Sequence, residues 1–278
     1  MNPERAGEPA PRGRVARGGL AAFARASAGR LAGVQLVVAL ATAACVVWFV
    51  ETAWAPVVVE AIRQLPPRAE IREGVLQWKG DNPATLAEGA FLSFAVDLGH
   101  GGKHRTPAQV QVEFGRSECL VISLLGERSV PYRRPDVVEF GRESLEPLWG
   151  AWHPLLVGGT ALAVVFGLPL IWGAIASLYT LPVYLAGLFG HRDLPFSASW
   201  RLAGASLMPG AVFMDLAIVL YGLGFLDLVR LSLAVAVHFL IGWGFLAAGL
   251  LSTPRHSPTA TASANPFRAA GGGPPAAS

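Results

Sequence analysis

The chain has 278 residues, of which 53% are hydrophobic and only 15% are charged, against roughly 25% charged in an average soluble protein. Its mean hydropathy of +0.45 is correspondingly high. Three segments, 31–50, 147–191 and 231–254, contain no Asp, Glu, Lys or Arg, and 202–226 contains only Asp215. Uncharged runs of this length are typical of segments that cross a lipid bilayer. The composition therefore excludes a cytosolic enzyme, a fibrous protein and a disulfide-stapled secreted domain.

The chain begins with a basic, low-complexity segment. Residues 1–30 contain six arginines and two glutamates and are rich in Ala, Gly and Pro, so we expect a disordered cytoplasmic tail beside anionic lipid headgroups. Residues 31–54 form the first predicted span. An A-x-A sequence of the signal-peptidase type ends at Ala55, but the Pro56 that follows it would obstruct cleavage. We therefore predict an uncleaved signal anchor.

The polar segment 55–152 is predicted to be a small, mostly antiparallel β domain outside the membrane. A short helix, 57–65, is expected to prolong the first span until Pro66 and Pro67 end it. Beyond it, short apolar segments bounded by turn residues predict strands. The expected strands are 70–72, 75–78, 91–98, 108–114, 119–125 and 137–140.

The second half of the chain is predicted to form a helical membrane bundle over 154–252. Its first part is ambiguous, because a helix over 154–189 would be about 54 Å long whereas the hydrocarbon core is about 30 Å thick. It is either two short spans, which gives five in all, or one span and an interfacial stretch, which gives four. Four is favoured, because the arginines between 190 and 202 and those after 254 then lie on the same side as the N-terminal tail. The predicted segments are a span at 154–176, an interfacial stretch at 177–190, spans at 203–226 and 231–252, and a disordered cytoplasmic tail at 253–278.

Residues 65–100 resemble part of a bacterial family of membrane proteins of unknown function. The resemblance is carried by Leu65-Pro66, Ile71-x-x-Gly74, Pro83 and a strand that ends in Asp97-x-Gly99. Members of that family have an N-terminal anchor, an extracytoplasmic domain with this proline-to-acid pattern and a following helical bundle. The resemblance implies a bacterial plasma membrane protein, and it carries over no catalytic residue.

Two ionisable residues lie near the middle of predicted spans, where such groups are costly and are usually paired or functional. Asp215 and His238 differ in depth by three residues, about 4.5 Å along a helix, so a direct or water-mediated contact can form. Two hypotheses stay open: a hydrogen bond that only holds the last hairpin together, worth about 0.6 kcal/mol, or a proton-binding or gating pair. Pro209 and Gly210 are expected to kink the third span, the alternative being an unwound ion site.

His100 and His104, four residues apart, are a weak candidate for a metal-binding loop. A zinc site needs three or four ligands, and only Asp97, Glu113 and Cys119 could supply the others. The favoured interpretation is a solvated turn, and neither a metal nor another cofactor is expected.

The sequence contains no phosphate-loop, zincin, dinucleotide or Gly-x-Ser-x-Gly signature, and no basic patch that would indicate nucleic acid. We therefore predict a non-enzymatic multi-pass protein of a bacterial plasma membrane, with both termini cytoplasmic. Its partners are the lipid bilayer and a protein that the outer domain binds or senses, and a homo-oligomer is left open. The rival hypothesis is a proton-linked transporter, or its accessory subunit, that uses Asp215 and His238. A membrane-embedded enzyme comes third.

Overall fold

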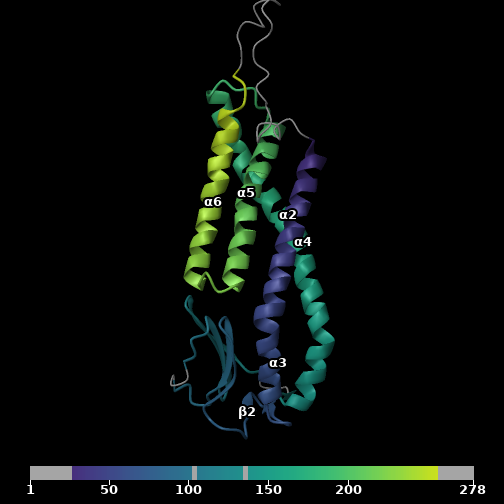
Figure 1. Ribbon diagram of the computed structural model, residues 1–278, viewed down its shortest axis with the longest axis vertical. Helices are drawn as coiled ribbons and strands as arrows, with labels where there is room; N and C mark the ends of the chain where they lie inside the picture. The colour runs from purple at the N-terminus through teal and green to yellow at the C-terminus, as the bar shows by residue number, and fades with distance from the viewer. Residues whose placement is uncertain (1–26, 102–104, 134–136, 256–278) are drawn as a thin grey trace, which may run out of the picture.

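The computed structural model describes residues 27–101, 105–133 and 137–255. The described molecule consists of a group of long helices and a β domain that lies at one end of them (Figure 1). The β domain lies below the turn between the last two helices and beside the lower part of the first (Figure 1). This arrangement places the polar half of the chain at one end of an apolar bundle.

Within the described residues, four helices are each long and apolar enough to cross a membrane. The first consists of α2 (Ala28–Phe49), the π-helical turn η1 (Val50–Trp54) and α3 (Ala55–Gln64). The others are α4 (Arg142–Phe189), α5 (Phe196–Gly222) and α6 (Leu228–Leu251). The first two contain 37 and 48 residues, or about 56 and 72 Å at the helical rise. Both therefore extend well beyond the thickness of a hydrocarbon core and reach the β domain.

The structure differs from the sequence prediction over α4. The segments 154–176 and 177–190 are not separate elements, because one helix runs through both to Phe189. The buried residues Ala176, Thr180 and Val183 are spaced by four and three, which keeps them on one helix face. Val183 packs with residues of α5 and α6, so tertiary packing continues the helix past the expected break. Whether 177–190 touches the inner interface stays a prediction.

Side-chain caps fix several helix ends. Ser27 Oγ accepts from the first turn of α2, and Asp227 Oδ1 accepts from the first turn of α6, as expected for N-cap residues. At the other end of α6, Arg192 Nη1 donates to the carbonyl oxygens of Leu251 at 2.5 Å and Thr253 at 2.7 Å. An arginine satisfies the last carbonyls of a helix and complements its dipole. The loop between α4 and α5 is thereby attached to the end of α6.

The described part of the β domain contains two sheets. The three-stranded sheet has the order β2–β1–β8 and the five-stranded sheet has the order β3–β4–β5–β6–β7. Among the described strands, only β4 and β5 pair in parallel, and the other neighbours are antiparallel, which confirms a mostly antiparallel domain. The strands β3 and β7 were not predicted. The strands are β1 (Glu70–Arg72), β2 (Val75–Gln77), β3 (Ala84–Glu88), β4 (Leu92–Val96), β5 (Val110–Phe114), β6 (Glu118–Ser123), β7 (Gly126–Pro131) and β8 (Val138–Glu139).

The helix α3 supplies one side of the β-domain core. Its Ala61, together with Leu65 that follows it, packs with buried residues of both sheets, among them Ile71 and Val96. The turn between β1 and β2 contains Gly74 with a φ of 76°, a left-handed conformation that glycine adopts without steric cost. The predicted strand–turn–strand is confirmed by the pairing of Ile71 with Leu76. Because α3 continues α2, this core is attached directly to the first apolar helix.

An aromatic cluster joins the β domain to the helices. The ring of Phe91, which precedes β4, lies 5.2 Å from Phe49 of α2 and 4.8 Å from Tyr221 of α5 between ring centroids. Gly222, at the end of α5, lies against Trp48, and a Cβ there would approach that ring to 2.6 Å. One end of the five-stranded sheet is therefore held at the end of α5.

Candidate functional site

The carboxyl group of Asp215 meets a hydroxyl group from another helix. Asp215 lies on α5 and is half-buried, and its Oδ1 is 2.6 Å from Oγ1 of Thr42 on α2. The same Oγ1 lies 3.0 Å from the carbonyl oxygen of Val38, one turn earlier in α2. The hydroxyl group of Thr42 thus lies between two oxygen atoms that can each accept a hydrogen bond.

His238 lies on α6, where the backbone of α6 comes close to Gly210 of α5. Its Nδ1 contacts the carbonyl oxygen of Val235 in the preceding turn. A Cβ at Gly210 would lie 2.5 Å from the carbonyl oxygen of His238, so this contact needs a glycine. The helix α5 is continuous through Pro209 and Gly210, and the alternative of an unwound ion site is therefore wrong. Gly210 instead lets the two helices approach each other.

Asp215 and His238 line one cavity of about 160 Å³, together with Thr42. The rest of its lining comes from apolar residues of α4, α5 and α6. Among the described residues, no hydrogen bond or ion pair joins Asp215 to His238. Oδ1 of Asp215 is bound to Thr42, and Nδ1 of His238 contacts a carbonyl oxygen of its own helix. Sequence reasoning thus placed the two residues in the same region, and it missed the partner of the carboxyl group.

The position of Thr42 allows Asp215 to keep a hydrogen bond in either protonation state. When Asp215 is ionised, the single hydroxyl hydrogen of Thr42 points to the carboxylate. When Asp215 is protonated, its own hydrogen points to Oγ1, and Thr42 donates to Val38 instead. The exchange needs only a rotation of the hydroxyl group, so a proton can be taken up without a rearrangement of the helices.

A second ionisable pair, not found from the sequence, lies between α4 and η1. Nε2 of His153 is 3.4 Å from Oε2 of Glu51, and the ring of Trp149 lies 5.0 Å from that of His153. Glu51 is part of the π-helical turn, a distortion that is frequent at functional sites. The available signals were a histidine inside the uncharged run 147–191 and the first acid after 31–50.

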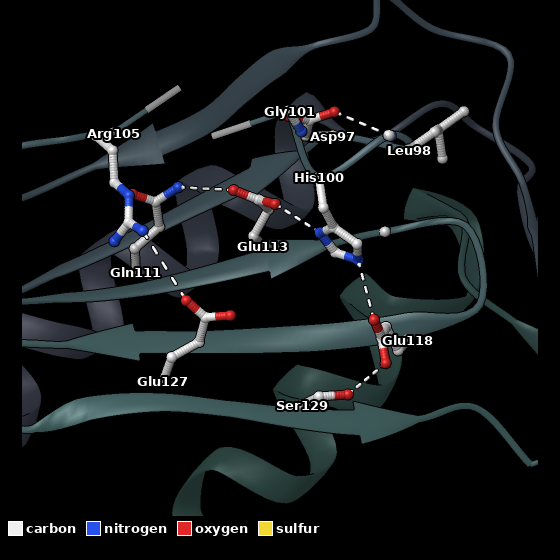
Figure 2. A network of polar contacts seen from close by, with 12 residues as sticks. Asp97, Leu98, His100, Gly101, Arg105, Gln111, Glu113, Glu118, Glu127 and Ser129 are labelled. Carbon is white, nitrogen blue, oxygen red and sulfur yellow. Dashed lines mark hydrogen bonds and ion pairs between the residues drawn. The ribbon is translucent and has the colours of Figure 1, made fainter. Parts of the chain in front are cut away.

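A network of polar side chains lies on the five-stranded sheet of the β domain (Figure 2). Glu113 is only 2% exposed, and both of its carboxylate oxygens have partners: His100 Nδ1 is 2.7 Å from Oε1, and Gln111 Nε2 donates to Oε2 at 3.2 Å. The imidazole of His100 lies between Glu113 and Glu118, whose Oε1 is 3.7 Å from Nε2 (Figure 2). The carboxylate of Glu113 is therefore bound by His100 on one oxygen and by Gln111 on the other.

The structure corrects the interpretation of His100 as part of a solvated turn. Its side chain is three-quarters buried, and its φ of 46° is uncommon for a residue other than glycine. The ring lies where a Cβ on Gly115 would be, 2.0 Å from Nε2. A local turn conformation and a neighbouring glycine thus direct His100 toward Glu113. The pairing of these two residues could not be predicted from the sequence.

The weak candidate for a metal loop, His100 with His104, is not tested as a pair, because His104 lies outside the described residues. Within the ranges that the structure describes, no three His, Cys, Asp or Glu side chains lie close enough together to hold a metal ion. Asp97, a ligand candidate, uses its two oxygens to accept from the backbone N–H groups of Gly99 at 3.0 Å and Gly101 at 2.8 Å. Its arrangement is that of a carboxylate that shapes a turn.

The thiol and the phenol beside this network are both held in their neutral forms. Burial, and then the negative charge of Glu113, raise the pKa of the Cys119 thiol. Burial is also the main cause that raises the pKa of Tyr132, whose hydroxyl group donates to the carbonyl oxygen of Gly115 at 3.2 Å. A reactive cysteine needs a lowered pKa, so Cys119 is not an activated nucleophile.

No family model matches this chain, and no curated protein or solved structure is similar to it.

Proposed function

We propose that the four apolar helices cross a bacterial plasma membrane, with the β domain on the outer side and both tails on the cytoplasmic side. This topology is supported by the separation of charge along the molecule. Arg192 and Arg201 lie at the end of the bundle that is remote from the β domain, where Arg192 contacts the end of α6. Arginines retained at one end of a short bundle mark the cytoplasmic side.

We further propose that the β domain binds a protein partner, and that this binding acts on the helical bundle without catalysis. The observation that carries this proposal is a cleft of about 370 Å³ between the three-stranded sheet and the first turn of α4. Because α4 continues from this cleft for 48 residues, a partner that displaces its first turn acts directly on the bundle. The first apolar helix also reaches this region, through α3.

The rim of the cleft carries charges of both signs. Arg68 and Glu143 form an exposed ion pair of 3.1 Å across it. Lys79 and Glu139 also line the cleft, and both are exposed. A polar segment with at least one acid and one base suits this rim better than an apolar ligand or a simple anion.

Photocrosslinking in intact cells tests this proposal. A photoreactive residue at position 139 should give an adduct that is lost when Lys79→Glu reverses the charge on the opposite side of the cleft. The matched control is position 127 on β7, which is exposed and lies on the other sheet. The absence of an adduct at position 139 would refute binding in the cleft. Adducts of equal yield at 139 and 127 that are unaffected by Lys79→Glu would refute it as well.

The second candidate function is proton-linked transport, either by this chain or as an accessory subunit of a carrier. It is favoured by the hydroxyl group of Thr42, which serves Asp215 in both protonation states within an apolar cavity that His238 also lines. Ionisable residues inside a membrane commonly mark proton pathways. Four spans would need an oligomer or a partner subunit to enclose a complete path.

Infrared difference spectroscopy across a pH titration tests whether Asp215 takes up a proton. The full-length protein in lipid should show a carboxylic acid band that disappears in Asp215→Asn, whose amide keeps the shape and the hydrogen bond to Thr42. Glu127→Gln serves as the control, because that side chain is exposed. If the band is unchanged in Asp215→Asn, Asp215 does not take up the proton, and Asp215 and His238 have a structural role alone.

A further inference from the structure

The hairpin between β6 and β7 has an unusual tip. Ser123 pairs with Gly126, so the two residues between them, Leu124 and Leu125, form the turn. Their exposed fractions are 64% and 74%. Two-residue hairpin turns normally contain Asn, Asp or Gly, and two leucines gain nothing from exposure to water. The tip therefore presents apolar side chains that the rest of the described chain leaves uncovered.

The strand that leads to the tip is free of charge as well. Residues 119–126 contain no Asp, Glu, Lys or Arg, whereas Glu118 and Glu127 stand on either side of them. The side chain of Glu127 is directed toward Arg105, at 3.9 Å. A charged pair next to an uncharged tip is the pattern expected where a loop meets a boundary between water and an apolar phase.

The register of the sheet places this tip at the end nearest the bundle. Leu92 of β4 pairs with Val110 of β5, and Val110 pairs with Ser123 of β6, so these residues form one row across the sheet. Phe91, next to Leu92, packs on Tyr221 at the end of α5. Since β6 is antiparallel to β5, it runs toward this end of the sheet, and the tip continues past the row in the direction of the helices.

A second apolar surface lies at the same level. The turn between α5 and α6 exposes Phe225 by 67%, and it follows Tyr221 by only four residues. Figure 1 shows the β domain directly below this turn. The hairpin tip and the α5–α6 turn thus form two exposed apolar points at the end of the membrane helices, which is where a bilayer surface would begin.

We propose that the Leu124–Leu125 tip inserts into the outer leaflet of the lipid bilayer and anchors the β domain at a further point, besides α3, α4 and the aromatic contact of Phe91 with α5. This inference rests on the proposed topology. The occupant is lipid, because the tip shares its level with the ends of the helices that cross the membrane. Insertion fixes the tilt of the five-stranded sheet relative to the membrane plane.

Depth-dependent fluorescence quenching in nanodiscs tests the insertion with the full-length protein. Single cysteines are introduced by Leu124→Cys, Val130→Cys and Leu216→Cys in a Cys45→Ala, Cys119→Ala background and labelled with a polarity-sensitive dye. Val130 is an exposed residue of β7 farther from the tip, and Leu216 is an exposed residue within α5. Lipids with a quencher near the headgroup or deep in the acyl chain are then compared.

The dye at position 124 should emit at shorter wavelength than the dye at 130 and lose its emission to the shallow quencher, while the dye at 130 is unaffected by either lipid. The dye at 216 should respond to the deep quencher. Quenching at 216 but not at 124 would overturn the anchor and leave the topology intact, whereas no quenching at 216 would overturn the topology itself. Short-wavelength emission at 124 without quenching would place the tip against protein, such as a second copy, and would also overturn the proposal.

Discussion

The β domain and the helical bundle differ in how many partners they provide for a buried carboxyl group. In the β domain, Glu113 is almost fully buried, and both of its oxygens are bound by neighbouring side chains. In the bundle, Asp215 is less buried, but the described residues give its carboxyl group one partner, the hydroxyl group of Thr42. A fully satisfied network of buried hydrogen bonds makes a region rigid and specifies one arrangement of its side chains. Burial alone therefore does not decide how many partners a carboxyl group has in this molecule.

The largest effect is expected from Glu113→Ala. This change removes a buried acceptor that His100 and Gln111 share inside the sheet, and it should lower the free energy of unfolding of the β domain by about 3 kcal/mol. Urea-dependent pulse proteolysis of the full-length protein measures it. Glu127→Ala, which removes only an exposed ion pair with Arg105, should cost less than about 0.5 kcal/mol. Equal losses would mean that the network does not hold the domain.

Gly210→Ala is expected to have the next largest effect. The added methyl group would meet the backbone of α6 at His238, and the forced separation should cost about 2 kcal/mol. Equilibrium unfolding in mixed micelles gives the measurement. The matched control is Gly244→Ala, because a Cβ at Gly244 meets nothing within 4 Å and the change only raises helix propensity. If both variants were neutral, the close approach of α5 and α6 would be wrong.

A smaller effect, a coupling energy, distinguishes Thr42 from His238 as the partner of Asp215. A double-mutant cycle with Thr42→Val and Asp215→Ala should give a coupling of about 0.6 kcal/mol, the average for hydrogen bonds between membrane helices. The cycle with His238→Ala should be additive, since no hydrogen bond or ion pair joins those two residues in the described chain. Coupling to His238 and not to Thr42 would reverse the assignment.

The smallest effect concerns Cys119. Because Glu113 is the second cause of its raised pKa, after burial, Glu113→Gln should lower that pKa without restoring the ordinary value. The thiolate then forms at lower pH, so the midpoint of the alkylation rate against pH should move down in a Cys45→Ala background. Local unfolding would instead expose the thiol, raise the rate and bring the midpoint back to the ordinary value, because burial is the larger cause, so a partial shift of the midpoint distinguishes the loss of the Glu113 charge from unfolding. Glu127→Gln should not move it.

The long apolar segments could be predicted from the sequence because hydrocarbon excludes charge over a whole span. The break expected after residue 176 was wrong, since Ala176, Thr180 and Val183 keep one face of α4 packed in the bundle. The edge strand β7 was missed because all six of its residues are exposed, so that no alternation of apolar and polar residues marks it.

Only the ionisable residues of the candidate site could be predicted from the sequence. Asp215 and His238 stand out because ionisable groups are rare inside membranes. Thr42 does not stand out, since a threonine in a membrane helix can satisfy its hydroxyl group on its own backbone, as it does with Val38. Its role depends on how α2 and α5 pack together, and that information is tertiary.

The central claim is that the β domain and the chain termini lie on opposite sides of a membrane crossed by four helices. Labelling with an impermeant thiol reagent tests it directly, using Val130→Cys on β7 and Ser252→Cys at the end of α6 in a Cys45→Ala, Cys119→Ala background. Both positions are exposed, so topology and not burial decides the result. We predict that position 130 is labelled in intact spheroplasts and that position 252 is labelled only after lysis. Labelling of 252 in intact spheroplasts, or protection of 130 until lysis, would contradict the account.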